Sequence, residues 1–560
     1  MLHSLADAQH FEHELIIHLP FNSWMAEAQW HSLRPSECGF VENERTSWSE
    51  ASAASVGTWS TEKYLPMAMA ENTRLGVIWF WQIEHNGSWY WEISNSSLRG
   101  GIADDVYAYL GGPDDLHSAA WKNLKPGETY ETVPVAVGCL QGGFGDAVEA
   151  LTRYRRVACE KPRKDNLRCP VIFNDYMNCL LGDPTTEKEM PLIEAAARAG
   201  CEYFVIDAGW YAERNEKWWE SVGLWQPSRT RWGPGGLGGV LEAIRSRGMV
   251  PGLWLEIEVA GIHSPLKDKP DAWFMNRHGA RVIDHGRYLL DFRNPEVRAY
   301  ADGVVDRIVG GYGVGYLKMD YNVDALLGTE RDADSPGQGL LEHQRAYLGW
   351  IDGVHARYPA LVIENCGSGG GRMDYAMLSH HQLQSSSDQR NYRLYPSIVA
   401  GALAAVLPEQ LGVWAYPKKD ADADAASFNM VNAMLARIHQ SGAIAELRDE
   451  SWREVREGIR IYKENIRPDI PRMVPFLPLG LPSMADTHSP VAVGLRGAAR
   501  SLIAVWRLDG DDDTVRLPVG AAKGVSVLYP TDLGIVCRGS PSAIEVRFPR
   551  RYMGAILEVR

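Results

Sequence analysis

The chain has 560 residues, more than a single hydrophobic core usually serves, so two or three domains are expected. Its content of 45% hydrophobic and 23% charged residues is that of an ordinary soluble globular protein. The net charge of −14 argues against nucleic acid and against an anionic membrane as partners.

The amino terminus and the cysteines indicate the compartment. No basic region followed by an apolar core opens the chain, and no apolar run approaches the ~18 residues of a spanning helix. The eight cysteines are scattered without a Cys-x-x-Cys pair, which favours reduced thiols over a disulfide framework or a zinc site. We therefore expect a cytoplasmic protein with no metal and no other cofactor.

The first 165 residues show short alternating runs that are separated by turn residues. Residues 75–83 and 88–93 are rich in tryptophan and β-branched residues, and Asn86-Gly87 lies between them. An Asn-Gly pair between two such runs predicts a β-hairpin. We interpret residues 1–165 as an antiparallel β-sandwich.

Residues 166–470 alternate apolar strands with amphipathic helices. Strands are predicted at residues 170–173, 203–207, 251–256, 314–320, 360–365, 382–385 and 412–416, with a short eighth strand near 440–444. Thr186 and Glu189 form a predicted capping box for the helix that follows the first strand. Eight such repeats predict a closed (β/α)8 TIM barrel, and the apolar run 287–291 is interpreted as an excursion from it.

After residue 470 the sequence again shows short runs in which apolar and polar residues alternate. Residues 491–495, 501–508, 525–529, 544–548 and 555–559 predict strands of a small antiparallel β domain over 471–560. The fold class is therefore multidomain α/β and β: a central barrel between an N-terminal sandwich and a C-terminal β domain.

Polar side chains gather at the carboxyl ends of the predicted barrel strands, where barrels build their active sites. Asp320 and Asp388 follow two different strands, and a pair of carboxyl groups at such a mouth can act as nucleophile and acid on a sugar. Lys318 lies two residues before Asp320 on the same strand face and would keep that carboxylate ionised. The alternatives are solvated loop carboxylates and a structural Lys318–Asp320 ion pair.

Several motifs occur in the order typical of one family. They are residues 204–210, 252–258, 290–298, Tyr316-Leu-Lys-Met-Asp-Tyr-Asn322, residues 364–374 and Ser387-Asp388. On these motifs, over residues 75–500, the chain resembles glycoside hydrolase family 36, the α-galactosidases.

The resemblance implies roles for individual residues. Asp320 is then the nucleophile and Asp388 the acid/base, in a retaining exo-acting enzyme that removes terminal α-galactosyl groups by double displacement. The substrate-binding residues implied by it or by the strand ends are Asp207, Trp210, Trp254, Lys318, Asn322, Cys366 and Gly369. The expected partner is an oligosaccharide or glycoside, and a homo-oligomer stays open.

The sequence departs from the family in three places. Ala208 replaces a second aspartate that grips the axial 4-hydroxyl in many members, and we expect Asp175 or Asn174 to substitute for it. Asn391 stands where many members have another aspartate. The N-terminal region is also much shorter than that of the larger members, which use it in tetramer contacts.

Three alternatives stay open. An α-N-acetylgalactosaminidase would need space at the 2-position of the sugar, where Cys366 and its glycine neighbours suggest a site sized for a hydroxyl. A transglycosylase would use the same two carboxyl groups. A metal-dependent barrel lyase or isomerase would need converging acidic ligands, which Asp207, Glu256 and Glu258 resemble.

Overall fold

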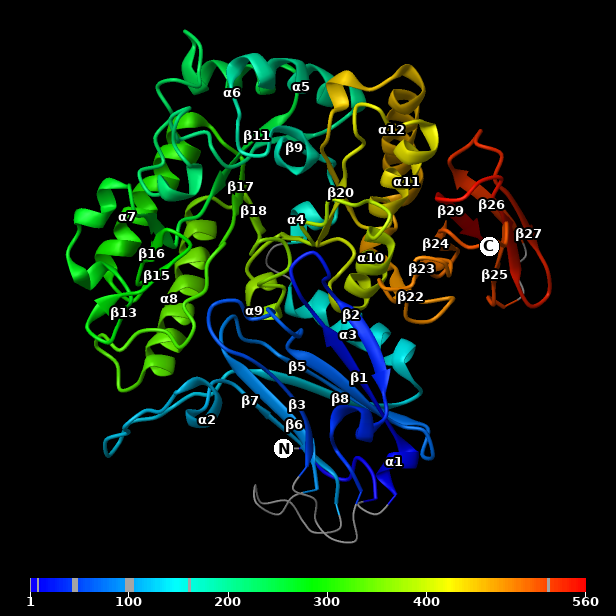
Figure 1. Cartoon of the computed structure of the whole chain (residues 1–560), viewed down its shortest axis with the longest axis horizontal. Coiled ribbons are helices and arrows are strands. Elements are labelled where there is room, and N and C mark those ends of the chain that lie inside the picture. Colours follow the sequence, from blue (N-terminus) through cyan, green and yellow to red (C-terminus); the bar gives the residue numbers. More distant parts are fainter. Residues whose placement is uncertain (1, 8–9, 43–48, 96–104, 160–162, 521–523) are drawn as a thin grey trace.

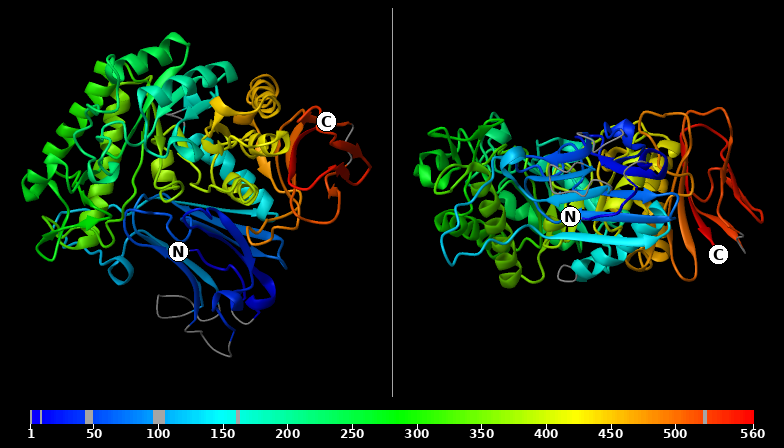
Figure 2. Two further views of the ribbon diagram at one scale, coloured as in Figure 1. Left: turned by 45° about the horizontal axis from the view of Figure 1, so that its top comes forward. Right: turned by 90° about the horizontal axis from the view of Figure 1, so that it is seen from below.

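The computed structural model describes the chain except residues 1, 8–9, 43–48, 96–104, 160–162 and 521–523. A closed parallel barrel forms its centre, with antiparallel sheets from both ends of the chain packed against it (Figure 1). The left view of Figure 2 shows the N-terminal sheets below the barrel and the C-terminal sheets beside it, and the right view, from below, shows the N-terminal strands in front of the barrel. The predicted multidomain α/β and β fold is confirmed.

The N-terminal region is a sandwich of two antiparallel sheets. One sheet has the order β2-β1-β4-β5-β8 and the other β3-β6-β7. The strands are β1 (Leu15–Phe21), β2 (Gln29–Leu33), β3 (Glu50–Ser55), β4 (Met67–Asn72), β5 (Val77–Ile83), β6 (Trp89–Ser94), β7 (Tyr107–Gly111) and β8 (Val135–Gln141). Trp81 of β5 meets Trp91 of β6 edge-on inside the core, with ring centroids 5.3 Å apart.

The predicted hairpin between β5 and β6 is wrong, although both strands exist. β5 pairs with β4 and β8, whereas β6 pairs with β3 and β7 in the opposite sheet. A two-residue Asn-Gly turn needs positive φ, and neither Asn86 nor Gly87 has it. The Asn86 side chain is instead buried and donates to Gln344 Oε1 over 2.8 Å, so this connection crosses between the sheets and docks on the barrel.

Eight parallel strands close the barrel. They are β9 (Ile172–Asn174), β10 (Tyr203–Ile206), β11 (Val250–Leu255), β17 (Tyr316–Met319), β18 (Val362–Asn365), β19 (Leu383–Ser385), β20 (Leu411–Ala415) and β21 (Arg437–Gln440). The eighth strand therefore precedes its predicted place at 440–444. Arg437 and His439 are buried there, and Arg437 pairs with Asp165 over 2.9 Å, so this strand lacks an apolar pattern.

Helices cover the barrel and connect its strands. They are α5 (Thr186–Ala199), α6 (Gly236–Ser246), α7 (Pro295–Val305), α8 (Pro336–Arg357), α9 (Tyr375–Leu378), α10 (Tyr395–Ala405), α11 (Ala423–Ala433) and α12 (Asp449–Ile461). The N-cap of α5 is Thr185, whose side chain accepts from Lys188 N, so the predicted capping box of Thr186 and Glu189 is wrong: Lys188 holds the third helical position. Glu189 is consequently free to point into the interior, where it is fully buried.

The excursion after the third barrel strand is confirmed as a separate small sheet. Its strands β12 (Val259–Gly261), β15 (Ile283–Asp284) and β16 (Arg287–Leu289) pair antiparallel in the order β12-β16-β15. A second antiparallel pair, β13 (Asn276–Arg277) and β14 (Ala280–Arg281), lies between β12 and β15 in the sequence.

The C-terminal region contains two antiparallel sheets, β22-β23-β24-β29-β26 and β25-β28-β27. The strands are β22 (Val474–Phe476), β23 (Val491–Arg496), β24 (Ser501–Arg507), β25 (Thr514–Leu517), β26 (Val525–Tyr529), β27 (Val536–Gly539), β28 (Ile544–Arg547) and β29 (Met553–Val559). All five strands predicted for this region are present. The remaining helices, α1 (Phe11–Glu14), α2 (Asp115–Ser118), α3 (Phe144–Ala158) and α4 (Arg163–Asn166), belong to the N-terminal part of the chain.

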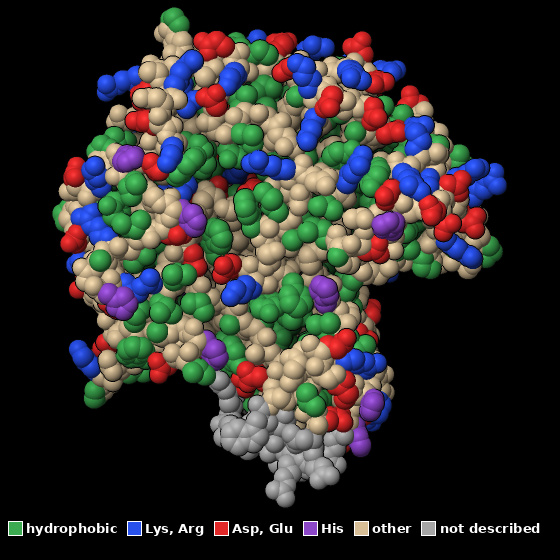
Figure 3. Space-filling model, in the orientation of Figure 1, with side chains coloured by type: hydrophobic (Ala, Val, Ile, Leu, Met, Phe, Trp, Pro, Cys, Tyr) green, Lys and Arg blue, Asp and Glu red, His purple; other side chains and the backbone are tan. Residues whose placement is uncertain are grey.

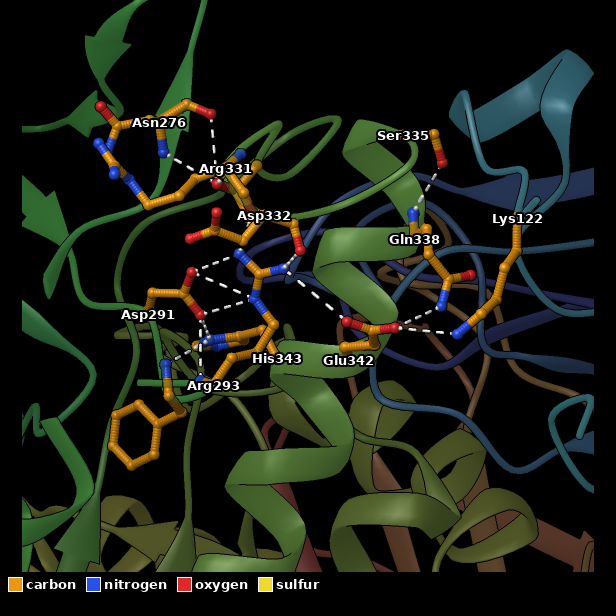
Figure 4. A network of polar contacts seen from close by, with 12 residues as sticks. Lys122, Asn276, Asp291, Arg293, Arg331, Asp332, Ser335, Gln338, Glu342 and His343 are labelled. Atoms are coloured by element: carbon orange, nitrogen blue, oxygen red, sulfur yellow. Dashed lines mark hydrogen bonds and ion pairs between the residues drawn. The ribbon is translucent and has the colours of Figure 1, made fainter. Parts of the chain in front are cut away.

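A charged network ties the N-terminal region to the barrel (Figure 4). Arg293, just after the excursion, pairs with Asp291 over 2.6 Å and lies 3.8 Å from Glu342 on α8. The other oxygen of Glu342 faces Lys122, which follows α2, over 3.4 Å. The excursion, a barrel helix and the N-terminal chain therefore share one set of polar contacts.

Acidic and basic side chains are interspersed over the face in Figure 3, so the net charge of −14 is not gathered into one patch there. Among the described residues, no helix is both long and apolar enough to cross a membrane.

Candidate active site

A cavity of about 480 Å³ opens at the carboxyl ends of the barrel strands. Its polar lining comes from barrel strand ends and from the excursion, and its rim is aromatic. The lining residues are Trp24, Tyr176, Asp207, Ala208, Trp218, Trp219, Glu220, Trp254, His285, Gly286, Arg287, Lys318, Asp320, Asn322, Ser368 and Asp388. The two carboxyl groups singled out in the sequence, Asp320 and Asp388, thus face one space.

Asp320 follows β17 directly and is surrounded by hydrogen-bond donors. Its Oδ1 accepts from the backbone N–H groups of Tyr321 over 2.8 Å and Ser368 over 3.2 Å. Its Oδ2 accepts from Trp254 Nε1 over 3.1 Å and from Asn322 Nδ2 over 3.0 Å. Donors on both oxygens stabilise the ionised carboxylate.

The positive charge of Lys318 also stabilises the ionised form of Asp320. Burial opposes ionisation of Asp320, but the Lys318 ammonium and hydrogen bonds, among them those of Asn322 and Trp254, hold its pKa below the ordinary value. Lys318 Nζ itself donates to Asp207 Oδ2 over 2.9 Å, with both side chains buried. The alternative of a structural Lys318–Asp320 ion pair is therefore wrong: Lys318 pairs with Asp207 and acts on the charge of Asp320 through space.

Asp388 has the opposite electrostatic surroundings. Burial, followed by the negative charge of Asp320, raises its pKa above the ordinary value. Among the described residues, its carboxyl group accepts one hydrogen bond, from Trp24 Nε1 over 3.1 Å. A carboxyl group with few donors and a nearby negative charge favours the protonated form.

Gly369 supports the backbone at Asp388. Its φ is +81°, and a Cβ there would lie 2.8 Å from Ser387 Cα and 2.9 Å from Asp388 N. A side chain at this position would therefore displace the segment that carries Asp388. The neighbouring Cys366 is buried, and its sulfur accepts from Gly369 N over 3.3 Å.

The wall formed by β9 and β10 is built in two layers. Asp207 lines the cavity, and its Oδ2 accepts from Asn174 Nδ2 over 2.7 Å. Asp175 lies behind it, 2% exposed, and its Oδ1 accepts from Asp207 N over 2.7 Å. Burial raises the pKa of Asp175 to about 7, and burial also raises the pKa of the adjacent Glu189.

Some of the predicted site residues line the cavity, and the others lie outside its lining. Those on the cavity are Asp207, Trp254, Lys318, Asn322, Asp320 and Asp388, whereas Trp210, Cys366, Gly369, Asn174 and Asp175 are not on its surface. Trp210 is fully buried and donates to Trp254 O over 2.9 Å, so it supports the aromatic wall from behind. The carboxyl group of Asp175 therefore does not face the space left by Ala208.

Sequence reasoning missed much of the rim. Trp24 comes from the N-terminal sandwich, Trp218 and Trp219 from the connection after β10, and Arg287 from the excursion. The Arg287 side chain is available to the cavity because β16 folds back over the barrel mouth. Arg287 begins the apolar run 287–291, but nothing in that run indicates that its first side chain faces the cavity.

The three carboxylates that resemble a metal site each have a cationic partner. Glu256 pairs with Arg287 over 2.7 Å, and Glu258 with Arg372 over 2.6 Å. Asp207 pairs with Lys318, as described above. In the part of the chain that the structure describes, no three His, Cys, Asp or Glu side chains are grouped so that they could hold a metal ion.

Comparison with known sequences identifies relatives of this chain. The profile of the melibiase family matches residues 129–468. Alpha-galactosidase Mel36A of Lactobacillus acidophilus is 28% identical over 260 residues, which are 45% of this chain and 35% of that protein. An alpha-galactosidase of Escherichia coli is 26% identical over 395 residues, 70% of this chain and 52% of the relative. The matches thus span between about a third and half of these relatives.

Solved structures share the fold along nearly the whole chain. The galactosidase domain of alpha-galactosidase-sucrose kinase AgaSK superposes with a TM-score of 0.79 at 20% identity, covering 98% of this chain and 74% of that one. Alpha-galactosidase AgaA of Geobacillus stearothermophilus, in complex with raffinose, gives 0.77 at 19% identity, covering 98% and 75%. The family profile covers more than half of the chain, and the protein belongs to the melibiase family.

Proposed function

We propose that this protein is a retaining exo-acting α-galactosidase that hydrolyses terminal α-galactosyl groups of galacto-oligosaccharides and galactosides. The observation that carries the proposal is the pair of carboxyl groups in one cavity with opposite pKa shifts, lowered for Asp320 and raised for Asp388. Two carboxyl groups held in different protonation states are what a double displacement at a sugar requires.

Each carboxyl group then has a defined step. Asp320 attacks the anomeric carbon while Asp388 gives its proton to the glycosidic oxygen, so the bond to the leaving alcohol breaks as the glycosyl–aspartate bond forms. Asp388, now ionised, takes a proton from water, which attacks the anomeric carbon and releases Asp320. Lys318 and the donors around Asp320 stabilise its charge before attack and after release.

Selectivity for the 4-hydroxyl needs a source other than an aspartate at position 208. Ala208 lines the cavity near Trp218, and Arg287 lies across the Trp218 ring, 5.5 Å from its centre. Asp207 and Arg287 are charged groups on the cavity, whereas Asp175 is behind it. We infer that these two residues bind the outer hydroxyls and that Asp175 holds Asp207 in place.

Hydrolysis of a panel of aryl α-glycosides tests the function. The panel contains the galactoside, the N-acetylgalactosaminide, the glucoside and the β-L-arabinopyranoside, which lacks the 6-hydroxymethyl group. We expect the galactoside to be cleaved best. A preference for the N-acetylgalactosaminide would favour that activity instead, and equal cleavage of the glucoside would contradict selection at the 4-position.

The stereochemistry of the product tests retention. NMR of the first-formed sugar should show the α-anomer, as two successive inversions require. In an experimental structure the two carboxyl groups should lie ~5–6 Å apart. Initial release of the β-anomer, or a separation near ~9 Å that leaves room for water, would instead indicate a single inversion.

We also infer the domain division 1–165, 166–470 and 471–560, which is supported by separate apolar clusters in the sandwich and in the C-terminal sheets. A cytoplasmic location is supported by the eight cysteines, all of them unpaired. A homo-oligomer stays a proposal, and its test is the molar mass in solution.

A further inference from the structure

The loop between β1 and β2, residues 22–28, leaves the sandwich and reaches the mouth of the barrel (Figure 1). Asn22 Nδ2 donates to Gly370 O over 3.2 Å, in the glycine-rich segment beside Asp320. Gln389 Nε2 donates to Met25 O over 2.8 Å, directly after Asp388. The loop is thus bonded to both barrel segments that carry or flank the two carboxyl groups.

The base of the same loop is packed without space. A Cβ on Gly401 of α10 would lie 1.8 Å from Ala28 O, and a Cβ on Gly370 would lie 2.8 Å from Glu27 Cγ. The buried Glu27 is in turn close enough to Asp388 for their charges to interact. These close contacts hold the base of the loop against the barrel, with Trp24 on the lining of the cavity.

Trp24 makes two kinds of contact there. Its indole N–H donates to Asp388 Oδ2, the hydrogen bond described above, while the residue as a whole is 61% exposed and lines the cavity. An indole that is fixed at its N–H and open along its face is suited to stack on an apolar sugar face or an aryl group.

We propose that Trp24 is a further residue of the active site: it orients Asp388 through its N–H, and its ring forms the binding surface for the leaving group. The inference rests on the proposed glycosidase function. Because the N–H occupies Oδ2, the proton to be transferred is held on the other oxygen of Asp388. Because Asp388 gives that proton to the glycosidic oxygen, a ring beside it meets the group that departs.

The hydrogen bond also affects when Asp388 is protonated. A donor to a carboxylate favours the charged form, so Trp24 lowers the pKa of Asp388 against the burial and the charge of Asp320 that raise it. Titratable or charged groups that interact with Asp388 come from several elements: Asp320, Lys318, Asp207, Glu27, Tyr176, Cys366 and Tyr395. Replacement of Trp24 leaves all of these in place.

Two variants separate the roles of the indole. Trp24→Phe removes the N–H and keeps an aromatic ring, whereas Trp24→Ala removes both. Trp121→Phe is the matched control, since Trp121 is an exposed tryptophan of the same region that does not line the cavity. For each protein, kcat and KM are measured over pH on an aryl α-galactoside and on raffinose, and thermal unfolding confirms the fold.

For Trp24→Phe we expect kcat/KM on raffinose to fall about tenfold, the loss of one hydrogen bond to a charged group, with a smaller loss on the aryl galactoside. The alkaline limb of the profile should move to higher pH, because Asp388 loses a donor that favours ionisation. For Trp24→Ala the KM for raffinose should rise further, and Trp121→Phe should match the parent.

The inference is overturned if both Trp24 variants keep the alkaline limb of the parent's pH profile and the parent's ratio of kcat/KM on raffinose to kcat/KM on the aryl galactoside. A uniform loss on both substrates with an unmoved limb would also overturn it, since that is the result of a structural role. These outcomes are distinct from failure of the proposed function, in which the parent itself cleaves no α-glycoside of the panel and both proposals fall.

Discussion

The surroundings of Asp320 and Asp388 differ in the number and origin of their donors. Within the described part of the chain, Asp320 accepts hydrogen bonds from the barrel and its loops, among them those of Tyr321, Ser368, Trp254 and Asn322. Asp388 accepts one among the described residues, and it comes from the N-terminal sandwich. Under the proposed mechanism, the carboxyl group that stays charged has several donors from the barrel, whereas the carboxyl group that carries a proton has one donor, which comes from the N-terminal sandwich.

Removal of the first carboxylate should have the largest effect. Asp320→Ala should lower kcat roughly 10⁴-fold or more, because no glycosyl–aspartate bond can form. Added azide or formate should restore part of the cleavage of an aryl galactoside as an external nucleophile. Asp268→Ala, at an exposed site, is the control; near-normal turnover by the Asp320 variant would refute its assignment as nucleophile.

Removal of the second carboxyl group should produce a loss that depends on the leaving group. Asp388→Ala should lower kcat/KM on raffinose by about 10²–10⁴-fold, since an unactivated alcohol needs a proton to depart, and much less on an aryl galactoside. The parent should lose activity at low pH as Asp320 becomes protonated and at high pH as Asp388 ionises.

On activated substrates the Asp388 variant should lack the high-pH limb, which a pH profile of kcat/KM measures. Equal losses on both classes of substrate in the first half-reaction would show that Asp388 is not the acid.

Displacement of Asp388 by a neighbouring substitution should lower activity less than replacement of Asp388 itself. Gly369→Ala puts a Cβ against Ser387 and Asp388 and forces a side chain into positive φ. We expect kcat/KM on raffinose to fall roughly hundredfold, the scale of a small misplacement of a reacting group. Gly349→Ala, with nothing within 4 Å of the new Cβ, is the control and should keep full activity. An unchanged Gly369 variant would mean that Asp388 tolerates movement.

The smallest expected effect concerns the layer behind Asp207. Because the pKa of Asp175 is about 7 in the fold and 3.8 in its absence, its contribution to stability is present at low pH and is lost as the pH rises through about 7. Asp175→Asn keeps an acceptor for Asp207 N and does not titrate. The Tm of the variant minus the Tm of the parent should therefore increase from pH 5 to pH 8. The kcat/KM of the variant should differ from that of the parent by less than tenfold. A Tm difference that is constant over pH would contradict this.

The barrel and both flanking β regions followed from alternation of apolar residues, since parallel strands and amphipathic helices have separate periods. Which strands pair with one another was harder to predict. β5 and β6 have the spacing of a hairpin, but the side chain of Asn86 between them binds Gln344 on α8, far along the chain. The eighth strand was misplaced because Arg437 and His439 are polar residues buried by partners that local sequence does not reveal.

The same distinction applies to the candidate site. Asp207, Lys318, Asp320 and Asn322 stand at strand ends, and chain order alone places strand ends together at one mouth. Trp24 and Arg287 reach the cavity from a sandwich loop and from an excursion. Their position depends on tertiary docking, for which neither spacing nor residue type is a signal.

The fit of the β1–β2 loop has a consequence for protein engineering. Chimaeras that exchange the N-terminal sandwich between relatives, or trim it to obtain a smaller catalyst, would replace residues 22–28, a loop that contacts the barrel region at Gly370, Gln389 and Gly401. The crossover point should therefore keep this loop with its own barrel. Conversely, a library confined to this loop would vary the entrance without any substitution in the barrel.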